Sequence, residues 1–248
     1  VVNATMVITS KSLSTTFGKS QSTGSFAVSG GTGSKVWSIT NYSGGTSVDT
    51  STGNVTISTG VAVGIYNETL TVTDSLNVST SIRITITVND SITVTGGSNI
   101  TTTFGITKNS TAFVANNGTG TKTFSILPGT NGISINQNSG IVTVSATTPA
   151  GTYYETITAT DSVTATGFTT MTVLVNPGVT VTGGSNITTT YSRADSSTAF
   201  IANNGTGTKT FSILPNVSGI SIDSSTGIVS VSSSTAAGTY VETVTATD

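Results

Sequence analysis

One stretch of the sequence decides the fold: Asn116-Asn117-Gly118-Thr119-Gly120-Thr121-Lys122-Thr123-Phe124-Ser125-Ile126-Leu127-Pro128, which returns unchanged at 203–215. The same step of 87 residues continues outward, since 93–103 reappears at 180–190 and the first third of the chain carries a more diverged copy. A fixed period of this size indicates repeated structural units rather than one large domain. The sequence therefore predicts three domains, at 1–90, 91–177 and 178–248.

Each unit reads as short strands separated by turns. In the second unit, apolar and polar residues alternate with period two, and Gly, Asn, Ser and Pro fill the gaps between the alternating runs. About seven short strands per unit is the pattern of an immunoglobulin-like sandwich. We predict an all-β fold of three tandem immunoglobulin-like β-sandwich domains, the last without its final strand. The strands expected in the second unit are Ile92–Thr95, Ser110–Ala115, Thr121–Leu127, Gly132–Ile135, Ile141–Ala146, Thr152–Thr160 and Thr166–Val175.

Two sets of aromatic residues recur at fixed places in the repeat. One set lies in the third strand, where such sandwiches bury a large ring. The other opens the sixth strand after a Gly, the place of a tyrosine corner whose hydroxyl bonds nearby backbone. A stacking platform for sugars or bases is the functional alternative, but the apolar neighbours favour a core role. The predicted core residues are Trp37, Phe124, Phe211, Tyr66, Tyr153 and Tyr240.

One motif of the third unit resembles a known family. It runs Gly219-Ile220-Ser221-Ile222-Asp223-Ser224-Ser225-Thr226-Gly227-Ile228-Val229 and is followed by Ala237-Gly238-Thr239-Tyr240 and Thr243-Val244-Thr245-Ala246-Thr247-Asp248. These residues resemble the cadherin-like, Ig-type tandem repeats of bacterial surface and fibre proteins. The resemblance covers all three units, with the first departing most, and it implies rods of β-sandwiches in adhesins or stalks on cell surfaces.

Composition excludes several classes of function. Only 7% of residues are charged and the net charge is −2, which argues against a nucleic-acid partner because phosphate binding needs clustered Lys and Arg. No apolar run approaches the ~20 residues of a membrane-spanning helix. With no His and no Cys, neither a Ser-His-Asp triad nor a thiol nucleophile is available, so we expect no enzyme activity. The 56 Thr and 37 Ser take over the surface role of charges, and this composition favours export to the cell surface.

The repeat breaks at the end of the third unit. Asp248 corresponds to Asp161, just after the sixth strand, so the third unit lacks the counterpart of 162–174 and with it most of the seventh strand. Its sixth strand is then an edge that another strand can pair with. We expect this acceptor strand to use Tyr240, Glu242, Val244 and Ala246.

The amino-terminal segment is a candidate donor for that edge. Val2, Ala4, Met6 and Ile8 share one apolar face, whereas the equivalent face of the second unit falls on the other parity at Ile92 and Val94. A one-residue shift turns every side chain to the opposite face, so we expect this strand to pair differently from its counterparts. A single deletion before Leu13 is the alternative explanation of the shift.

Carboxylates recur once per unit and are candidates for structural roles. Glu68, Glu155 and Glu242 share one place in the sixth strand, and a repeated carboxylate fits a scaffold better than three active sites. Asp74, Asp161 and Asp248 end that strand near a unit junction, where cadherin-like repeats often hold calcium. The second junction has Asn176-Pro177 in place of Asn89-Asp90, so the oxygen ligands that calcium needs are not sustained. We expect turn capping, with no cofactor and no bound metal.

Glycosylation is the modification that the sequence supports best. Twelve of the 18 Asn residues lie in Asn-x-Ser/Thr sequons, where chance at this Ser/Thr content gives roughly seven. Sugars linked to Ser or Thr hydroxyls are a second possibility. The candidate sites are Asn3, Asn41, Asn54, Asn67, Asn77, Asn89, Asn99, Asn109, Asn117, Asn186, Asn204 and Asn216.

Three classes of function follow from these observations. The first is a subunit of an extracellular pilus-like filament, a head-to-tail homopolymer in which Val1–Ser10 of one copy completes the third domain of the next by β-strand donation. The second is a stalk segment of a larger cell-surface adhesin. The third is a carbohydrate-binding module, which needs exposed aromatic rings; Tyr42 and Tyr154 are the obvious ones.

Overall fold

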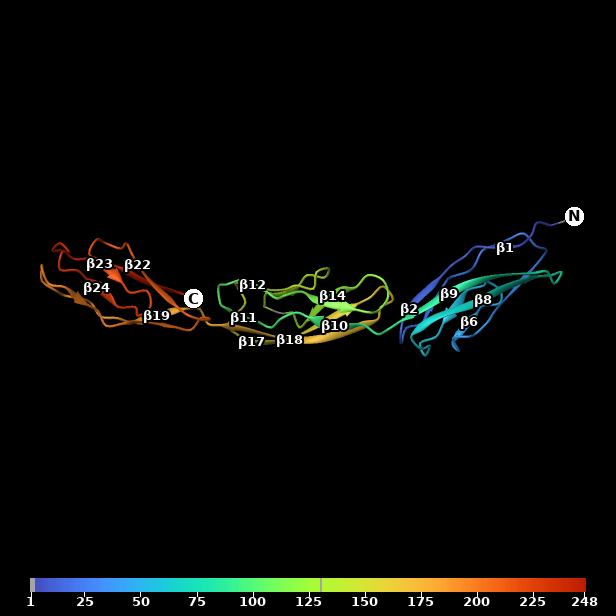
Figure 1. Ribbon diagram of the computed structural model, residues 1–248, viewed down its shortest axis with the longest axis horizontal. Helices are drawn as coiled ribbons and strands as arrows, with labels where there is room; N and C mark the ends of the chain where they lie inside the picture. Colours follow the sequence, from blue (N-terminus) through green and yellow to red (C-terminus); the bar gives the residue numbers. More distant parts are fainter. Residues whose placement is uncertain (1–2, 130) are drawn as a thin grey trace.

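The computed structural model describes residues 3–129 and 131–248. These residues form strands and turns with no helix, and the strands group into three units that follow one another along the long axis of the molecule (Figure 1). The amino terminus lies at one end of the chain of units. The carboxyl terminus lies next to the junction between the second and third units and not at the opposite end (Figure 1).

The first two units have the same set of nine strands. The first unit contains β1 (Val7–Ile8), β2 (Leu13–Thr16), β3 (Gln21–Ser22), β4 (Val28–Ser29), β5 (Lys35–Ile39), β6 (Thr46–Val48), β7 (Val55–Ile57), β8 (Gly64–Asp74) and β9 (Ser79–Asn89). The second contains β10 (Thr93–Gly96), β11 (Ile100–Thr103), β12 (Lys108–Asn109), β13 (Phe113–Asn116), β14 (Thr123–Leu127), β15 (Ile133–Ile135), β16 (Val142–Val144), β17 (Gly151–Thr160) and β18 (Thr166–Asn176).

The strand order confirms the immunoglobulin-like sandwich. One sheet of the first unit has the order β2-β9-β8-β5, and a second sheet has the order β3-β7-β6. In the second unit the corresponding orders are β11-β18-β17-β14 and β12-β16-β15. The last strand, β9 or β18, lies inside the larger sheet, antiparallel to the strand before it and parallel to β2 or β11. Each last strand therefore joins two parts of its sheet.

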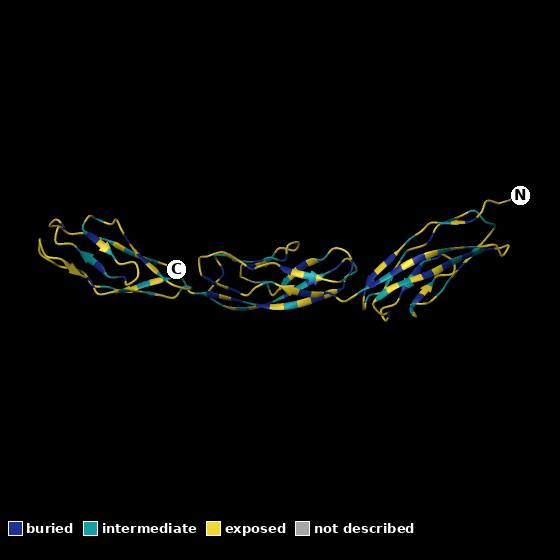
Figure 2. Cartoon of the chain, in the orientation of Figure 1, coloured by how far each residue is buried: buried dark blue, intermediate teal, exposed yellow. Residues whose placement is uncertain are grey.

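The core of each complete unit lies between the two sheets. Buried side chains of β8, β9 and β7, among them Leu70, Ile86 and Ile57, belong to one apolar cluster. Along β9 the buried and exposed residues alternate, because successive side chains of a strand point to opposite faces. This alternation appears as bands of blue and yellow along the strands in Figure 2.

The predicted aromatic positions are confirmed, with one exception. Trp37, Phe124 and Phe211 are buried. The tyrosine corners are also present, since each hydroxyl donates to the carbonyl four residues upstream: Tyr66 to Ala62 at 2.9 Å, Tyr153 to Pro149 at 2.8 Å and Tyr240 to Ala236 at 2.9 Å. The exception is Tyr240, which is exposed rather than part of the core because no last strand in the described part of the chain covers it.

All seven strands expected in the second unit are present, and two further short strands occur between them. These are β11 and β12, which the sequence pattern did not predict. In β11 only Ile100 is apolar, so the segment lacks an alternating signal. It becomes a strand because β18 offers a parallel partner from Val173 to Asn176.

The expectation of a differently paired first strand is wrong. Ile8 pairs with Val28 in the first unit as Val94 pairs with Ala115 in the second, so β1 has the same place as β10. The chain is one residue shorter between Ile8 and Leu13 than in the second unit, and this deletion alone accounts for the shift in parity. The alternative explanation was the correct one.

The third unit has seven strands and an open side. Its strands are β19 (Thr180–Gly183), β20 (Asp195–Ser196), β21 (Phe200–Asn203), β22 (Thr210–Leu214), β23 (Ile220–Ile222), β24 (Val229–Val231) and β25 (Thr243–Thr247). The larger sheet is reduced to the pair β22-β25, and the described residues contain no counterpart of β9 or β18. Among the described residues, three apolar side chains are buried in its cluster, compared with fourteen in that of the second unit.

Candidate functional site

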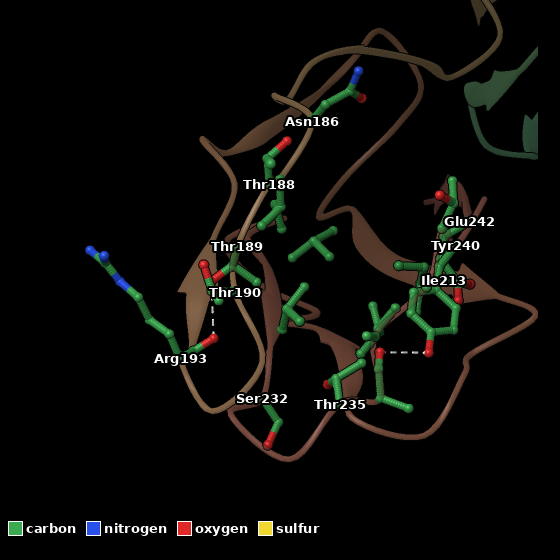
Figure 3. Close-up of a pocket in the computed structure, with 18 of the residues that line it drawn as sticks. Asn186, Thr188, Thr189, Thr190, Arg193, Ile213, Ser232, Thr235, Tyr240 and Glu242 are labelled. Carbon is green, nitrogen blue, oxygen red and sulfur yellow. Dashed lines mark hydrogen bonds between the residues drawn. The ribbon is translucent and has the colours of Figure 1, made fainter.

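A groove replaces the missing strand of the third unit. Its volume is about 470 Å³. Figure 3 shows Thr188, Thr189 and Thr190 on one side of the hollow and Tyr240 and Glu242 on the other. The floor is apolar and includes Ile213, Ile220, Val229 and Val244.

Both walls of the groove are segments that pair with the last strand in the complete units. The equivalents of Ile187–Thr190 form β2 and β11, whereas this segment is not a strand in the third unit. On the other wall, β17 begins at Gly151, but β25 begins only at Thr243, where the pairing with β22 starts. Without a last strand, 238–242 has no ladder partner among the described residues and loses its strand geometry.

Three of the four predicted acceptor residues lie along this wall. Tyr240, Glu242 and Val244 line the groove, whereas Ala246 lies further along β25 and pairs with Phe211 of β22. Glu242 and Val244 are half-buried, whereas their counterparts in the second unit are almost completely buried, Glu155 at 1% exposure and Ile157 at 0%. The groove therefore exposes surface that the last strand covers in the complete units.

The predicted donor residues lie in the first unit itself. Met6 is buried in the core of that unit and Ile8 packs against it, so donation of these side chains to another copy would remove them from their own core. Ala4 is exposed and its carbonyl accepts a hydrogen bond from the N–H of Gly31 at 2.8 Å. Val2 lies outside the described residues. Deletion of Val1–Ser10 would thus also remove β1 from the first unit.

The two junctions between units share one polar cluster. At the first junction, the Thr16 hydroxyl donates to Asp161 Oδ2 at 2.5 Å and lies 2.9 Å from the Thr119 hydroxyl, and Asn89 Nδ2 donates to the Thr119 hydroxyl at 2.9 Å. At the second junction the same contacts are made by Thr103, Asp248, Thr206 and Asn176, at 2.7, 2.8 and 2.9 Å. The sequence pattern did not predict this cluster, although the 87-residue step relates each of its members between the two junctions.

The aspartates of these junctions are held in their charged form. Burial acts to raise the pKa of Asp161, but hydrogen bonds from the Thr119 N–H and the Thr16 hydroxyl outweigh it and hold the pKa below its usual value. The other oxygen, Oδ1, accepts from the N–H groups of Val163 and Ala165 at 3.0 and 2.9 Å. Asp161 therefore caps its own turn and binds the preceding unit at the same time.

Acid should weaken this junction. Because the pKa of Asp161 is lower in the folded chain than its unfolded value of about 3.9, its contribution is complete above that value and is lost as the pH falls through the folded pKa. We expect Asp161→Asn to lower the free energy of unfolding by about 2 kcal/mol at neutral pH, the range for hydrogen bonds to a charged group. The difference from the unchanged chain should shrink as the pH falls below about 4.

Thermal unfolding of both chains between neutral pH and about pH 2 measures this difference. The control is Asp90→Asn, since Asp90 is exposed and, among the described residues, its carboxylate accepts only from the N–H of Ser91. The control should show no comparable loss at neutral pH. A difference between the unchanged chain and Asp161→Asn that does not vary with pH would contradict the assigned role.

The repeated glutamates anchor a turn. Glu68 is completely buried and accepts from the N–H of Tyr42 at 3.1 Å, the N–H of Ser43 at 3.0 Å and the Thr40 hydroxyl at 2.7 Å. Burial alone would raise the pKa of Glu68, but these hydrogen bonds lower it overall. Glu242 binds the N–H groups of Asn216 and Val217 in the same way, at 3.0 and 3.2 Å. In the first unit this contact holds the turn after β5 against β8, and in the third unit it holds the turn after β22 against the segment that leads into β25.

No metal-binding group of three or more His, Cys, Asp or Glu side chains occurs in the described part of the chain. The junction aspartates use their oxygens to accept hydrogen bonds from N–H and O–H groups. Among the described residues there is also no helix long and apolar enough to cross a membrane.

The structure separates the candidate glycosylation sites by accessibility. Ten of the twelve Asn residues are exposed, and the exceptions are Asn54 and Asn89, which are half-buried. Asn54 Oδ1 is buried, and Asn89 Nδ2 is used inside the first junction. The exposed sites are spread over all three units. The two spare aromatic residues, Tyr42 and Tyr154, are each 75% exposed but lie in different units, so they do not form one sugar-binding platform.

Comparisons with known proteins add a resemblance in fold. No protein-family model and no curated protein matches the chain. Three cadherin domains of mouse cadherin-23 (EC22–24) are 17% identical with a TM-score of 0.33, covering 92% of this chain and 88% of theirs. Titin I67–I69 is 11% identical with a TM-score of 0.43 over 99% and 94%, and Drosophila N-cadherin EC1–3 is 12% identical with a TM-score of 0.32 over 90% and 85%.

These TM-scores are low, so the class of the fold rests on strand order and register and not on these similarities. By that criterion the chain is a tandem array of immunoglobulin-like β-sandwich units, with an open groove in the third.

Proposed function

We propose that the chain is a structural subunit of an extracellular, pilus-like filament in which a β-strand from the next copy fills the groove of the third unit. The observation that carries this proposal is the groove itself, which has the place of β9 and β18 and an apolar floor. Its partner is another copy of the chain, and the filament grows because a head-to-tail contact does not close on itself.

The complete units define the strand that the groove needs. In β18 the side chains of Met171, Val173 and Val175 point into the core and are nearly or completely buried. Ile84, Ile86 and Val88 do the same in β9. Burial of each such side chain is worth about 1.5–3 kcal/mol. A strand with apolar residues at every second position is therefore the occupant that the groove favours.

The direction of the last strand decides which end of the next copy can supply it. β18 runs away from the preceding junction and β9 from the free end of the first unit, and both lead directly into the next unit. A strand that lies in the groove of the third unit and continues into the first unit of another copy runs in this same direction. Since Met6 and Ile8 serve their own unit, we place the donated residues on the amino-terminal side of Asn3, where the repeat aligns Val2 in sequence with Val88 and Val175. Of the donor segment expected from Val1–Ser10, only Val1 and Val2 remain part of the proposed donor.

Surface chemistry supports an extracellular location. The described units present hydroxyl-rich faces with few charges, and ten exposed sequons offer sites for sugars. The bacterial surface proteins that the third-unit motif resembles are built from similar units. The repeated aspartates and glutamates bind backbone N–H groups, which is a scaffold role and not a catalytic one.

A tandem-repeat stalk of a larger adhesin is the second candidate. The observation in its favour is that the same polar junction occurs twice within one covalent chain, so further units could follow in the same way. In that case a covalent strand after Asp248 occupies the groove.

Blocking the groove tests the proposal. Val244→Arg puts a charge on the floor, and we expect it to abolish end-to-end association of the purified chain in electron microscopy and sedimentation. The control is Val241→Arg, at a side chain that is 84% exposed, which should associate normally. A peptide with the sequence of Ser162–Asn176 should also block the unchanged chain, which excludes misfolding of the variant as the cause.

A density map of the native particle then separates the two candidates. Density beside β25 that continues into Asn3 of a neighbouring copy supports the filament. Density that continues covalently from Asp248 supports the stalk. Association that persists with the groove blocked would contradict strand donation.

A further inference from the structure

The polar junction cluster is divided between the two ends of the chain. Each internal junction combines a threonine and the final asparagine of one unit, at its end facing the next unit, with a threonine and an aspartate of that next unit. The equivalent threonine of the third unit is Thr190, and the equivalents at the amino-terminal end of the first unit are Thr32, Asp74 and Asn3. Each end thus carries the part that the other lacks.

The free end of the third unit has the same local geometry as the corresponding ends of the first two units. The Thr189 hydroxyl donates to the Arg193 carbonyl at 3.0 Å, as Thr15 does to Lys19 at 3.0 Å in the first unit. The N–H of Arg193 donates to the carbonyl of Thr190 at 3.0 Å, which closes the same turn. Thr190 is exposed, whereas Thr16 is completely buried in the first junction.

The amino-terminal end of the first unit has most of the complementary cluster. Asn3 Nδ2 donates to the Thr32 hydroxyl at 2.6 Å, the contact that Asn89 makes with Thr119 at 2.9 Å. The N–H of Thr32 donates to Asp74 Oδ2 at 2.8 Å. Asn3 therefore has the position of the residue that ends β9. The member absent from this cluster is a threonine hydroxyl from a preceding unit, and Thr32 is correspondingly half-buried where Thr119 is buried.

We propose that Thr190 of one copy contacts Thr32 and Asp74 of the next, forming between copies the junction that occurs twice within the chain. This inference rests on the proposed head-to-tail assembly and adds the surfaces that meet and their register. The Thr190 hydroxyl donates to Asp74, and the N–H of Tyr191 donates to the carbonyl of Asn3, as the N–H of Phe17 does to that of Asn89 at 2.8 Å. The repeat of the filament is then set by the same contacts as the spacing of the units.

Cysteine crosslinking tests this contact, because the chain has no cysteine of its own. Thr190→Cys and Thr32→Cys copies are mixed under mild oxidation, and we expect a covalent dimer. The control pair replaces Thr190→Cys with Thr188→Cys, on the groove wall of the third unit, and should give at least tenfold less dimer. A double variant with Thr16→Cys and Thr119→Cys, whose hydroxyl oxygens are 2.9 Å apart, should form the equivalent disulfide within one chain and shows that the geometry permits it.

The outcomes separate this inference from the proposed function. Dimers that depend on the Thr190 position support it, and Thr190→Val should then weaken end-to-end association about tenfold, as expected for one hydrogen bond to a charged group. Filaments that form while only the internal disulfide appears would overturn the junction and leave strand donation standing. If the unchanged chain does not associate at all, both proposals fail.

Discussion

A copy of the sequence Ser162–Asn176, fused after Asp248, should raise the unfolding temperature of the third unit by about 20–40 °C. The fused strand can follow β25 as β18 follows β17, and its three inward side chains would add about 5 kcal/mol of apolar burial. A unit of this size shifts by about 4–8 °C per kcal/mol. Calorimetry of the full chain measures the effect as a change in the least stable transition.

The matched control is the same fusion with aspartates in place of the residues copied from Met171 and Val173. It has the same length and the same linker but cannot enter an apolar groove, so it should leave the transition unchanged. The fusion with the unchanged Ser162–Asn176 sequence should also block end-to-end association, because its strand occupies the site of the donated strand. An unfolding temperature that is equal in both fusions would show that the groove does not accept a last strand.

Replacing Trp37 should have the second largest effect. Trp37 is 3% exposed, and its ring lies over Gly53, where an added Cβ would be 2.8 Å from the ring. We expect Trp37→Ala to destabilise the first unit by about 3–5 kcal/mol, the usual range for removing a buried aromatic residue. Chemical denaturation monitored by far-ultraviolet circular dichroism measures this change, because that signal reports on the backbone and not on the tryptophan that is replaced.

The repeat supplies the control for this prediction. Phe124 has the same place in the second unit, so Trp37→Phe should cost less than half as much as Trp37→Ala. Val36→Ala, at a neighbouring side chain that is 58% exposed, should be close to neutral. Equal losses in Trp37→Phe and Trp37→Ala would mean that the core of the first unit is not equivalent to that of the second.

The repeat allowed much of the fold to be predicted. Strands such as β17 and β18 carry a strong alternation of apolar and polar residues, and the turns between strands carry Gly and Asn at positive φ, as at Asn117 and Gly118. The tyrosine corners were also predictable, because Tyr153 follows Gly151 at the start of β17, the place where such sandwiches have this tyrosine. The open side of the third unit was also predictable, since it follows from comparing lengths.

Features that depend on partners far apart in the sequence were not predictable. Ile100–Thr103 is a strand only because β18 lies beside it, and local alternation does not report a parallel partner. The parity shift at Ile8 pointed to a new pairing, but a local deletion preserved the old one. The junction cluster was missed because Thr and Asn are so common in this chain that the four residues that matter do not stand out.

The parallel pairing of β2 with β9 has a mechanical consequence. Tension along the array enters a unit near its first strands and leaves through its last strand, so the hydrogen bonds between β2 and β9 are loaded together in shear instead of being opened one after another. The third unit has no such pair among its described residues, and it is the weak link under load until its groove is filled. Filling the groove would therefore do more than join two copies, because it would place the last unit of each under the same shear protection as the others.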